Sequence, residues 1–113
     1  MEKLKKTKIK YISPIAFYRL YLTNARIKVI DIREISEYEE YHIRHSTNIP
    51  YDLLTTRPYL FINPKHTYYI ICKDSKLSKS ATTKLTELGY DAICVFGGLK
   101  AWRGDLAFEN FYD

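Results

Sequence analysis

The stretch Tyr68-Tyr-Ile-Ile-Cys-Lys-Asp-Ser-Lys-Leu-Ser78 joins an apolar run to a polar, cationic turn, with a cysteine at the junction. The pattern predicts a buried strand over 67–72 and a helix over 78–88 with Ser78 as its N-cap. Cys72 is therefore placed at the carboxyl end of a strand, just before a helix. Backbone N–H groups and the helix dipole stabilise anions there, so the position suits a thiolate. The alternative is an inert core cysteine at the tip of the strand.

Strand and helix patterns alternate on both sides of this stretch. Ser13-Pro14 predicts a helix start, because serine caps helices and proline fits the first helical position. Residues 27–32 are apolar enough for a central strand of a parallel sheet. The other predicted elements are strands at 8–12, 48–50 and 92–96, and helices at 14–22, 34–41, 51–61 (interrupted at Pro58) and around 101–102. This rhythm predicts an α/β fold with a five-stranded, mostly parallel sheet and helices on both faces.

Length and composition are those of one soluble domain spanning residues 1–113. The hydrophobic content is 46% and the charged content 27%, which are ordinary for globular proteins. No run of about 18 apolar residues exists, so no membrane partner is expected. The lysine-rich start lacks the apolar segment of a signal peptide. Two cysteines without a secretory context predict free thiols and a cytoplasmic location.

The net charge of +5 comes largely from one end of the chain. Five of the 18 basic residues lie in the first ten positions, and residues 1–8 are predicted to be a basic, frayed N-terminus. The rest of the chain is nearly neutral, and no basic stripe interleaved with aromatics can be placed, so no nucleic-acid partner is expected. The two cysteines and three histidines show no metal-ligand spacing, which predicts neither a metal nor a cofactor.

Three blocks of sequence carry a resemblance to a known family. The first is Val29-Ile-Asp-Ile-Arg33 with Glu37-Tyr38, His42-Ile43 and Asn48-Ile49-Pro50; the second is Ile70-Ile71-Cys72 with its loop; the third is Leu88-Gly89-Tyr90, Phe96-Gly97-Gly98 and Ala101-Trp102. In this order and spacing they resemble the single-domain rhodanese (thiosulfate sulfurtransferase-like) family. The resemblance covers about Val29 to Arg103 and implies the rhodanese-like version of the α/β fold.

The resemblance also implies a reaction. In such enzymes a cysteine thiolate takes the outer sulfur of a small donor, thiosulfate or a persulfide, and passes it to a thiol acceptor, which can be a protein. Here this implies Cys72 as the nucleophile. The implied substrate-binding residues are those that follow it, namely Lys73, Asp74, Ser75, Lys76, Leu77 and Ser78. Their N–H groups would form a cup around the sulfur, and Lys73 and Lys76 would attract an anionic donor unless they are ordinary solvated lysines.

The loop departs from the family pattern at two positions. The family commonly has glycine three residues after the cysteine, where this chain has Ser75, and often arginine five residues after it, where this chain has Leu77. A positive φ would strain Ser75. Leu77 removes a guanidinium that could grip an oxyanion.

Four other residues are candidates for roles around the site. Asp31 and Arg33 end a predicted strand, where ligands bind in parallel sheets, but a structural ion pair that supports the site is the preferred interpretation. His42 could act as a base, but is predicted instead to hydrogen-bond backbone. Cys94 is predicted to be buried and inert. A role as a resolving cysteine would require it to approach Cys72.

Two other functions fit parts of the same pattern. A rhodanese-related phosphatase also uses a strand-end cysteine, but has arginine six residues after it, where this chain has Ser78. A non-catalytic rhodanese-like module would keep the fold to bind a protein partner or to carry sulfur passively. Such modules often lack the cysteine, so the presence of Cys72 favours the sulfurtransferase.

Overall fold

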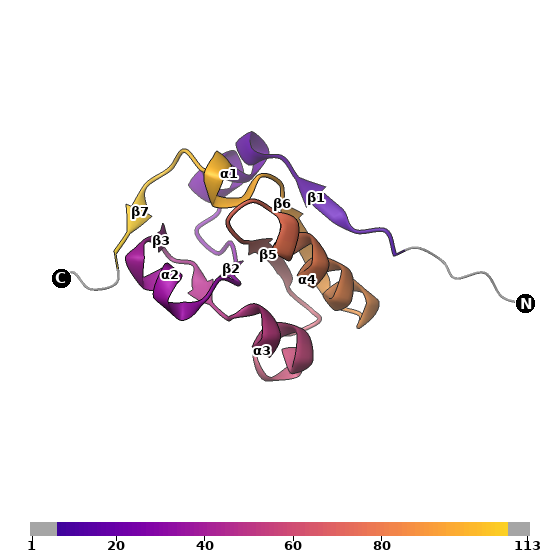
Figure 1. Ribbon diagram of the computed structural model, residues 1–113. Helices are drawn as coiled ribbons and strands as arrows, with labels where there is room; N and C mark the ends of the chain where they lie inside the picture. The colour runs from indigo at the N-terminus through magenta and orange to yellow at the C-terminus, as the bar shows by residue number, and fades with distance from the viewer. Residues whose placement is uncertain (1–6, 109–113) are drawn as a thin grey trace, which may run out of the picture.

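A computed structural model describes residues 7–108 of the protein and shows a parallel sheet covered by helices (Figure 1). The strands, in the sheet order β1-β6-β5-β2-β4, are β1 (Lys10–Ile12), β6 (Asp91–Val95), β5 (Thr67–Ile71), β2 (Val29–Asp31) and β4 (Thr47–Asn48). All neighbouring pairs in this sheet are parallel. The predicted α/β fold with five strands is confirmed.

Side-chain capping interactions fix where the first two helices begin. They are α1 (Pro14–Thr23), α2 (Ile35–Glu40), α3 (Tyr51–Thr56) and α4 (Lys76–Glu87), with 3-10 helices η1 (Pro58–Leu60) and η2 (Gly98–Ala101). Ser13 caps α1, since its Oγ accepts a hydrogen bond from the Ala16 N–H at 3.2 Å. Glu34 and Glu37 form a capping box at the start of α2. No helix within residues 7–108 is long and apolar enough to cross a membrane.

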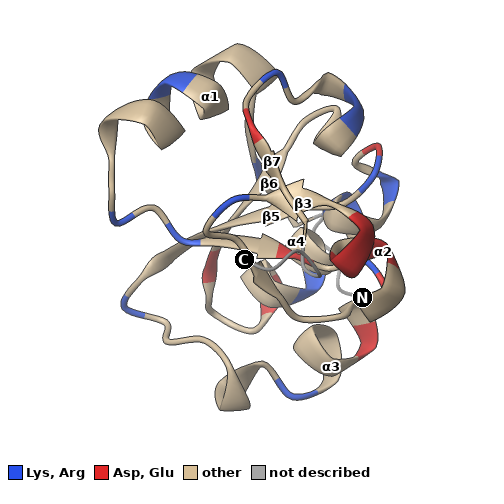
Figure 2. Ribbon diagram, turned by 90° about the vertical axis from the view of Figure 1, so that its left-hand side faces the viewer, with Lys and Arg blue, Asp and Glu red and all other residues tan. Residues whose placement is uncertain are grey.

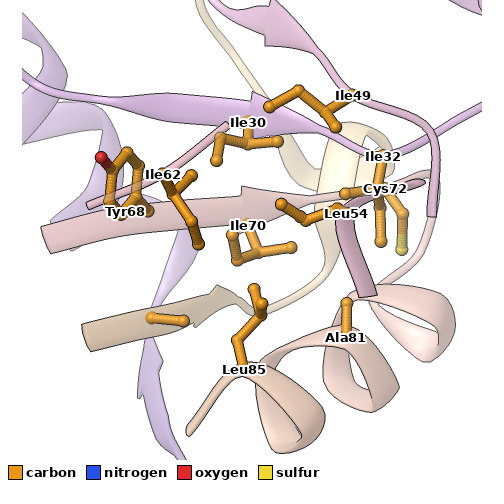
Figure 3. Close-up of a cluster of buried hydrophobic side chains, with 11 residues drawn as sticks. Ile30, Ile32, Ile49, Leu54, Ile62, Tyr68, Ile70, Cys72, Ala81 and Leu85 are labelled. Carbon is orange, nitrogen blue, oxygen red and sulfur yellow. The ribbon is translucent and has the colours of Figure 1, made fainter. Parts of the chain in front are cut away.

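Alternation along the strands divides the core between the two faces of the sheet. Successive side chains of a strand point to opposite faces, so Ile70 and Ile71 of β5 belong to different clusters. The cluster in Figure 3 lies under α3 and α4 and contains Ile30, Ile32, Ile49, Leu54, Ile62, Tyr68, Ile70, Cys72, Ala81, Leu85 and Ala92. The opposite face packs around Phe17 of α1, with Trp102 against it. Cys72 therefore points from the carboxyl end of the sheet toward α4.

Three features differ from the sequence predictions. A second, two-stranded antiparallel sheet joins β3 (His42–Ile43) to β7 (Leu106–Ala107). The last predicted helix is only the 3-10 helix η2, which ends before Trp102. The assignment of Ser78 as the N-cap of α4 is wrong, because the helix starts at Lys76 and its N-cap is Ser75. The predicted frayed N-terminus lies outside the described residues for positions 1–6.

Candidate functional site

The Cys72 sulfur lies at the first turn of α4 and is contacted there by Ser78. The Ser78 N–H donates to Cys72 Sγ at 3.2 Å, and the Ser78 Oγ lies 3.3 Å from the same sulfur. Cys72 is 2% exposed and Ser78 is fully buried. Ser78 therefore contacts the Cys72 sulfur from within the first turn of α4 and does not act as the N-cap of this helix.

The turn between Cys72 and α4 has an uncommon backbone conformation. Ser75 has φ 82°, in the left-handed region. Asp74 Oδ1 accepts a hydrogen bond from the Lys76 N–H at 3.1 Å, and the Ser75 carbonyl accepts one from Lys79 at 3.0 Å. The residue type that fits such a φ without strain is glycine. Ser75 therefore holds a strained conformation at the point where the loop enters the helix.

Helix η2 anchors this loop from the other side. The Leu99 N–H donates to the Cys72 carbonyl at 2.9 Å, and the Lys100 N–H donates to the Lys73 carbonyl at 3.0 Å. Peptide bonds are planar and trans, and none in the described part is cis. The N–H groups that follow these carbonyls, those of Lys73 and Asp74, consequently point away from η2. Neither has an acceptor within residues 7–108, so both are free to bind an anion.

Gly98 permits this close approach. A Cβ at position 98 would lie 2.5 Å from the Cys72 carbonyl oxygen and 2.7 Å from the Lys73 carbonyl carbon and oxygen. Real Cβ atoms do not approach backbone so closely, and the φ of Gly98 is also positive, at 58°. Glycine is required at this position by the contact between η2 and the Cys72 loop (residues 72–78).

A cavity of about 400 Å³ opens in front of Cys72. On one side it is lined by Lys73, Asp74, Lys76 and Leu77, and on the other by Ile32, Arg33, Glu34 and Glu37. Thus the structure brings four of the six predicted substrate-binding residues to the cavity wall. Ser75 and Ser78 do not line it. A larger cavity of about 490 Å³ lies at the amino ends of β2 and β5, but no cysteine borders it, so we assign the candidate site to the smaller one.

The charges around the Cys72 cavity are balanced. Three basic residues (Arg33, Lys73 and Lys76) and three acidic residues (Glu34, Glu37 and Asp74) line it. The Arg33 charge is already paired with Asp31, whereas Glu34 and Glu37 of the acidic wall are the N-cap and a first-turn residue of α2, a helix that carries acidic residues (red in Figure 2). This wall was not predicted from the sequence. The site therefore lacks the surplus of positive charge that would favour a dianion.

The three residues predicted to support the site form two separate sets of contacts. Arg33 grips buried Asp31 with Nε at 3.0 Å from Oδ1 and Nη2 at 3.0 Å from Oδ2, and Nη2 also donates to the Tyr41 carbonyl at 2.6 Å. His42 stacks on the Tyr38 ring at 3.7 Å between centroids, and its Nδ1 lies 2.7 Å from the Tyr38 carbonyl oxygen. Of these three, only Arg33 borders the cavity.

Cys94 is nearer to the site than its mid-strand position predicted. Its Sγ lies 3.4 Å from the Ser78 Oγ, the hydroxyl that also contacts Cys72. Burial raises the pKa of the Cys94 thiol and proximity to Cys72 adds to the rise, whereas the Ser78 hydroxyl, the Thr82 hydroxyl and the Lys79 charge oppose it. The parallel register pairs Ile70, two residues before Cys72, with Cys94 and so puts both cysteines on one face of the sheet; no local pattern in the sequence predicts this contact.

The fold and the site define a class: a parallel α/β domain in which a cysteine directly follows a central strand and its sulfur accepts a hydrogen bond from an N–H group in the first turn of the next helix. The family described as "Rhodanese-like domain" matches residues 16–105. The chain therefore belongs to the rhodanese-like domain family. A solved structure, the rhodanese-like domain protein from Staphylococcus aureus, is similar with a TM-score of 0.78 and 26% identity, covering 88% of this chain and 98% of that one.

Curated relatives are larger proteins. The putative sulfur carrier protein YrkF of Bacillus subtilis is 29% identical over 79% of this chain and 48% of its own length. The adenylyltransferase and sulfurtransferase uba4 of Ogataea parapolymorpha is 31% identical over 66% of this chain and 19% of its own. The chain thus spans less than half the length of these two relatives.

Proposed function

We propose that the protein is a sulfurtransferase that carries sulfane sulfur as a persulfide on Cys72. The observation that supports this most directly is the position of Cys72 Sγ. This sulfur borders a cavity of about 400 Å³ and accepts a hydrogen bond from the Ser78 N–H. The Lys73 and Asp74 N–H groups, which have no acceptor within residues 7–108, belong to the same loop. Such donors stabilise an anionic terminal sulfur where it forms.

The reaction has two displacement steps. The Cys72 thiolate attacks the outer sulfur of a donor R–S–S⁻, the donor S–S bond breaks, and RS⁻ leaves, so Cys72 carries the sulfur as Cys72–S–S⁻. An acceptor thiolate then attacks this outer sulfur, the new persulfide leaves on the acceptor, and the Cys72 thiolate is restored. Thiosulfate would react in the same way, with sulfite as the leaving group. Each step needs a thiolate and an aligned S–S bond, and no external oxidant.

The cavity walls favour an organic persulfide over thiosulfate as the donor. Thiosulfate is a dianion, and a strong anion site would present guanidinium or surplus lysine charge. Here Leu77 is 42% exposed and forms part of the wall, while Glu34 and Glu37 face Lys73 and Lys76 across the cavity. A persulfide of a small thiol, which carries apolar carbon as well as charge, fits these walls better. We propose a protein or small thiol as acceptor, and a reducing, cytoplasmic setting that suits two free cysteines.

Intact mass spectrometry tests the persulfide directly. The protein is incubated with glutathione persulfide or thiosulfate, and its mass is compared with that of Cys72→Ser. We expect the wild type to gain one sulfur atom and Cys72→Ser to gain none, while Cys94→Ser serves as the matched control and still gains it. The proposal is refuted if no donor adds sulfur, or if Cys72→Ser is loaded equally.

A substitution at Leu77 tests the donor preference. Leu77→Arg introduces at the cavity wall the cation that the family often has at this position. We expect kcat/KM for thiosulfate to rise about tenfold or more, and kcat/KM for glutathione persulfide to change much less. Leu77→Met, which preserves the apolar wall, is the control. Equal changes for both donors would remove the electrostatic argument.

A second candidate is a module that accepts sulfur without catalytic turnover. It is favoured by one finding, the similarity to a relative described as a putative sulfur carrier. Both candidates load Cys72 with sulfur, but only the enzyme releases it repeatedly to a free thiol. Sulfide production over many equivalents per protein molecule, in the presence of excess donor and dithiothreitol, separates them.

A further inference from the structure

A buried chain of three polar side chains extends behind the reactive sulfur. Cys72 Sγ, Ser78 Oγ and Cys94 Sγ are linked in sequence, at 3.3 Å and 3.4 Å. Ser78 and Cys94 are fully buried, and Cys72 is 2% exposed. The proposed sulfur transfer uses Cys72 and the Ser78 N–H but gives Cys94 no role.

The hydroxyl of Ser78 has one proton and can therefore donate to only one of its two sulfur neighbours. While Cys72 is a thiol, its S–H donates to Ser78 Oγ, and the hydroxyl proton is free to point toward Cys94. When Cys72 loses its proton, the thiolate needs a donor, and the Ser78 O–H can rotate toward it. The Ser78 oxygen then accepts a hydrogen bond from the Cys94 S–H. The two arrangements differ by one proton, the one that leaves Cys72.

We infer that Cys94 is a positioning residue: its S–H orients the Ser78 hydroxyl toward the Cys72 thiolate. This requires Cys94 to remain protonated when Cys72 is not. Burial raises the pKa of Cys94, which keeps it a donor at neutral pH. Hydrogen bonds strengthen one another in a buried site when they form a chain in which each group donates to one neighbour and accepts from the other. The role concerns Cys72 itself, so it holds whether or not the proposed sulfur transfer is correct.

The geometry argues against a different role for Cys94, as a resolving cysteine. Cys94 pairs in register with Ile70, two residues before Cys72. This diagonal offset separates the two Cα atoms by roughly 8 Å, from the spacing between strands and the rise along them. Disulfides require a shorter Cα separation, so a bond would need the sheet to move. The Ser78 hydroxyl contacts both sulfurs and couples the two thiols through hydrogen bonds, with no covalent bond between them.

Other groups around the two cysteines stay constant in the test. Lys73, Asp74, Lys76, Arg33, Glu34 and Glu37 line the cavity beside Cys72, and Lys79 and the Thr82 hydroxyl of α4 act on Cys94. None of them lies on β6, where Cys94 sits. Substitution at Cys94 therefore changes the donor behind Ser78 and leaves these charges in place.

The test measures how fast iodoacetamide alkylates Cys72 as a function of pH, followed by intact mass. Cys94→Ser keeps a donor of similar size, whereas Cys94→Ala removes it. We expect Cys94→Ala to slow alkylation about fivefold at pH 7, the effect of one lost hydrogen bond, and to move the half-maximal rate to higher pH. Cys94→Ser should behave as the wild type. Circular dichroism and urea unfolding establish that each variant is folded.

A Ser78→Ala background completes the design. Without the hydroxyl, Cys94 has nothing to orient, so adding Cys94→Ala should cause no further slowing. The inference is overturned if Cys94→Ala alkylates as fast as the wild type. It is equally overturned if Cys94→Ser is as slow as Cys94→Ala, or if Cys94→Ala slows alkylation equally in both backgrounds, because the effect is then one of packing.

Discussion

Replacing Gly98 by alanine places a methyl group inside the backbone of the Cys72 loop. The new Cβ would lie 2.5 Å from the Cys72 carbonyl oxygen and 2.7 Å from the Lys73 carbonyl. These atoms belong to backbone, so η2 must move away. Moving it breaks the two hydrogen bonds from Leu99 and Lys100 that hold the loop.

The cost follows from these contacts. Alanine in a left-handed conformation costs about 1–2 kcal/mol, and two lost hydrogen bonds cost about 1 kcal/mol each. We expect Gly98→Ala to lower the free energy of unfolding by about 3–4 kcal/mol. Gly89→Ala is the matched control, because Gly89 also has a positive φ, 94°, but its Cβ would meet nothing within 4 Å. The control should lose only the cost of the backbone conformation, about 1–2 kcal/mol.

Urea denaturation of the two variants beside the wild type measures the difference. The rate at which Cys72 gains sulfur from a persulfide donor measures the effect on the site, since displaced carbonyls misdirect the N–H groups of the cup. Gly98→Ala should lower both the free energy of unfolding and the rate at which Cys72 gains sulfur, whereas Gly89→Ala should lower only the free energy of unfolding. Equal destabilisation by both substitutions would refute the argument that η2 fixes the loop by close contact.

Three further predictions concern the neighbouring residues. Ser75→Gly should raise the urea midpoint, corresponding to roughly 0.5–1 kcal/mol, because glycine relieves the positive φ of 82°; an unchanged or lower midpoint would contradict the assigned strain. Asp31→Asn should destabilise the fold by about 3–5 kcal/mol in thermal unfolding, since it strands the buried Arg33 charge, and a loss below 1 kcal/mol would count against it. The hydrogen bond from Thr67 and, next, Lys10 lower the pKa of Asp91. The stability advantage of the wild type over Asp91→Asn is therefore present above the ordinary aspartate pKa and disappears as the pH falls through the lowered pKa of Asp91. An advantage that does not change with pH would contradict this shift.

Much of the fold follows from short-range patterns in the sequence. The apolar runs that became β2 and β5 are recognisable because a strand buried on both faces contains few polar side chains. The placement of Cys72 followed directly, since the end of an apolar run and the start of a helical pattern bracket it. The six residues after the cysteine were predicted as one group, because they are neighbours in the chain.

The parts that were missed depend on contacts between distant residues. The β3–β7 pair involves strands of two residues each, too short to carry a periodic pattern. Ser78 is a common capping residue, and only the position of Cys72 above it explains its burial inside α4. The acidic wall of Glu34 and Glu37 comes from another helix, and Cys94 reaches the site through sheet register. No local pattern predicts such approaches.

The two hydrogen bonds from η2 to the Cys72 loop also have a consequence for biosynthesis. Between the loop and η2 the chain forms all of α4 and β6. On the ribosome, Cys72 emerges well before the Leu99 and Lys100 amides that orient its cup. A nascent chain without them lacks the two hydrogen bonds that hold the Cys72 loop. If the proposed sulfur transfer is correct, we expect such an incomplete chain to accept sulfur more slowly than the finished domain.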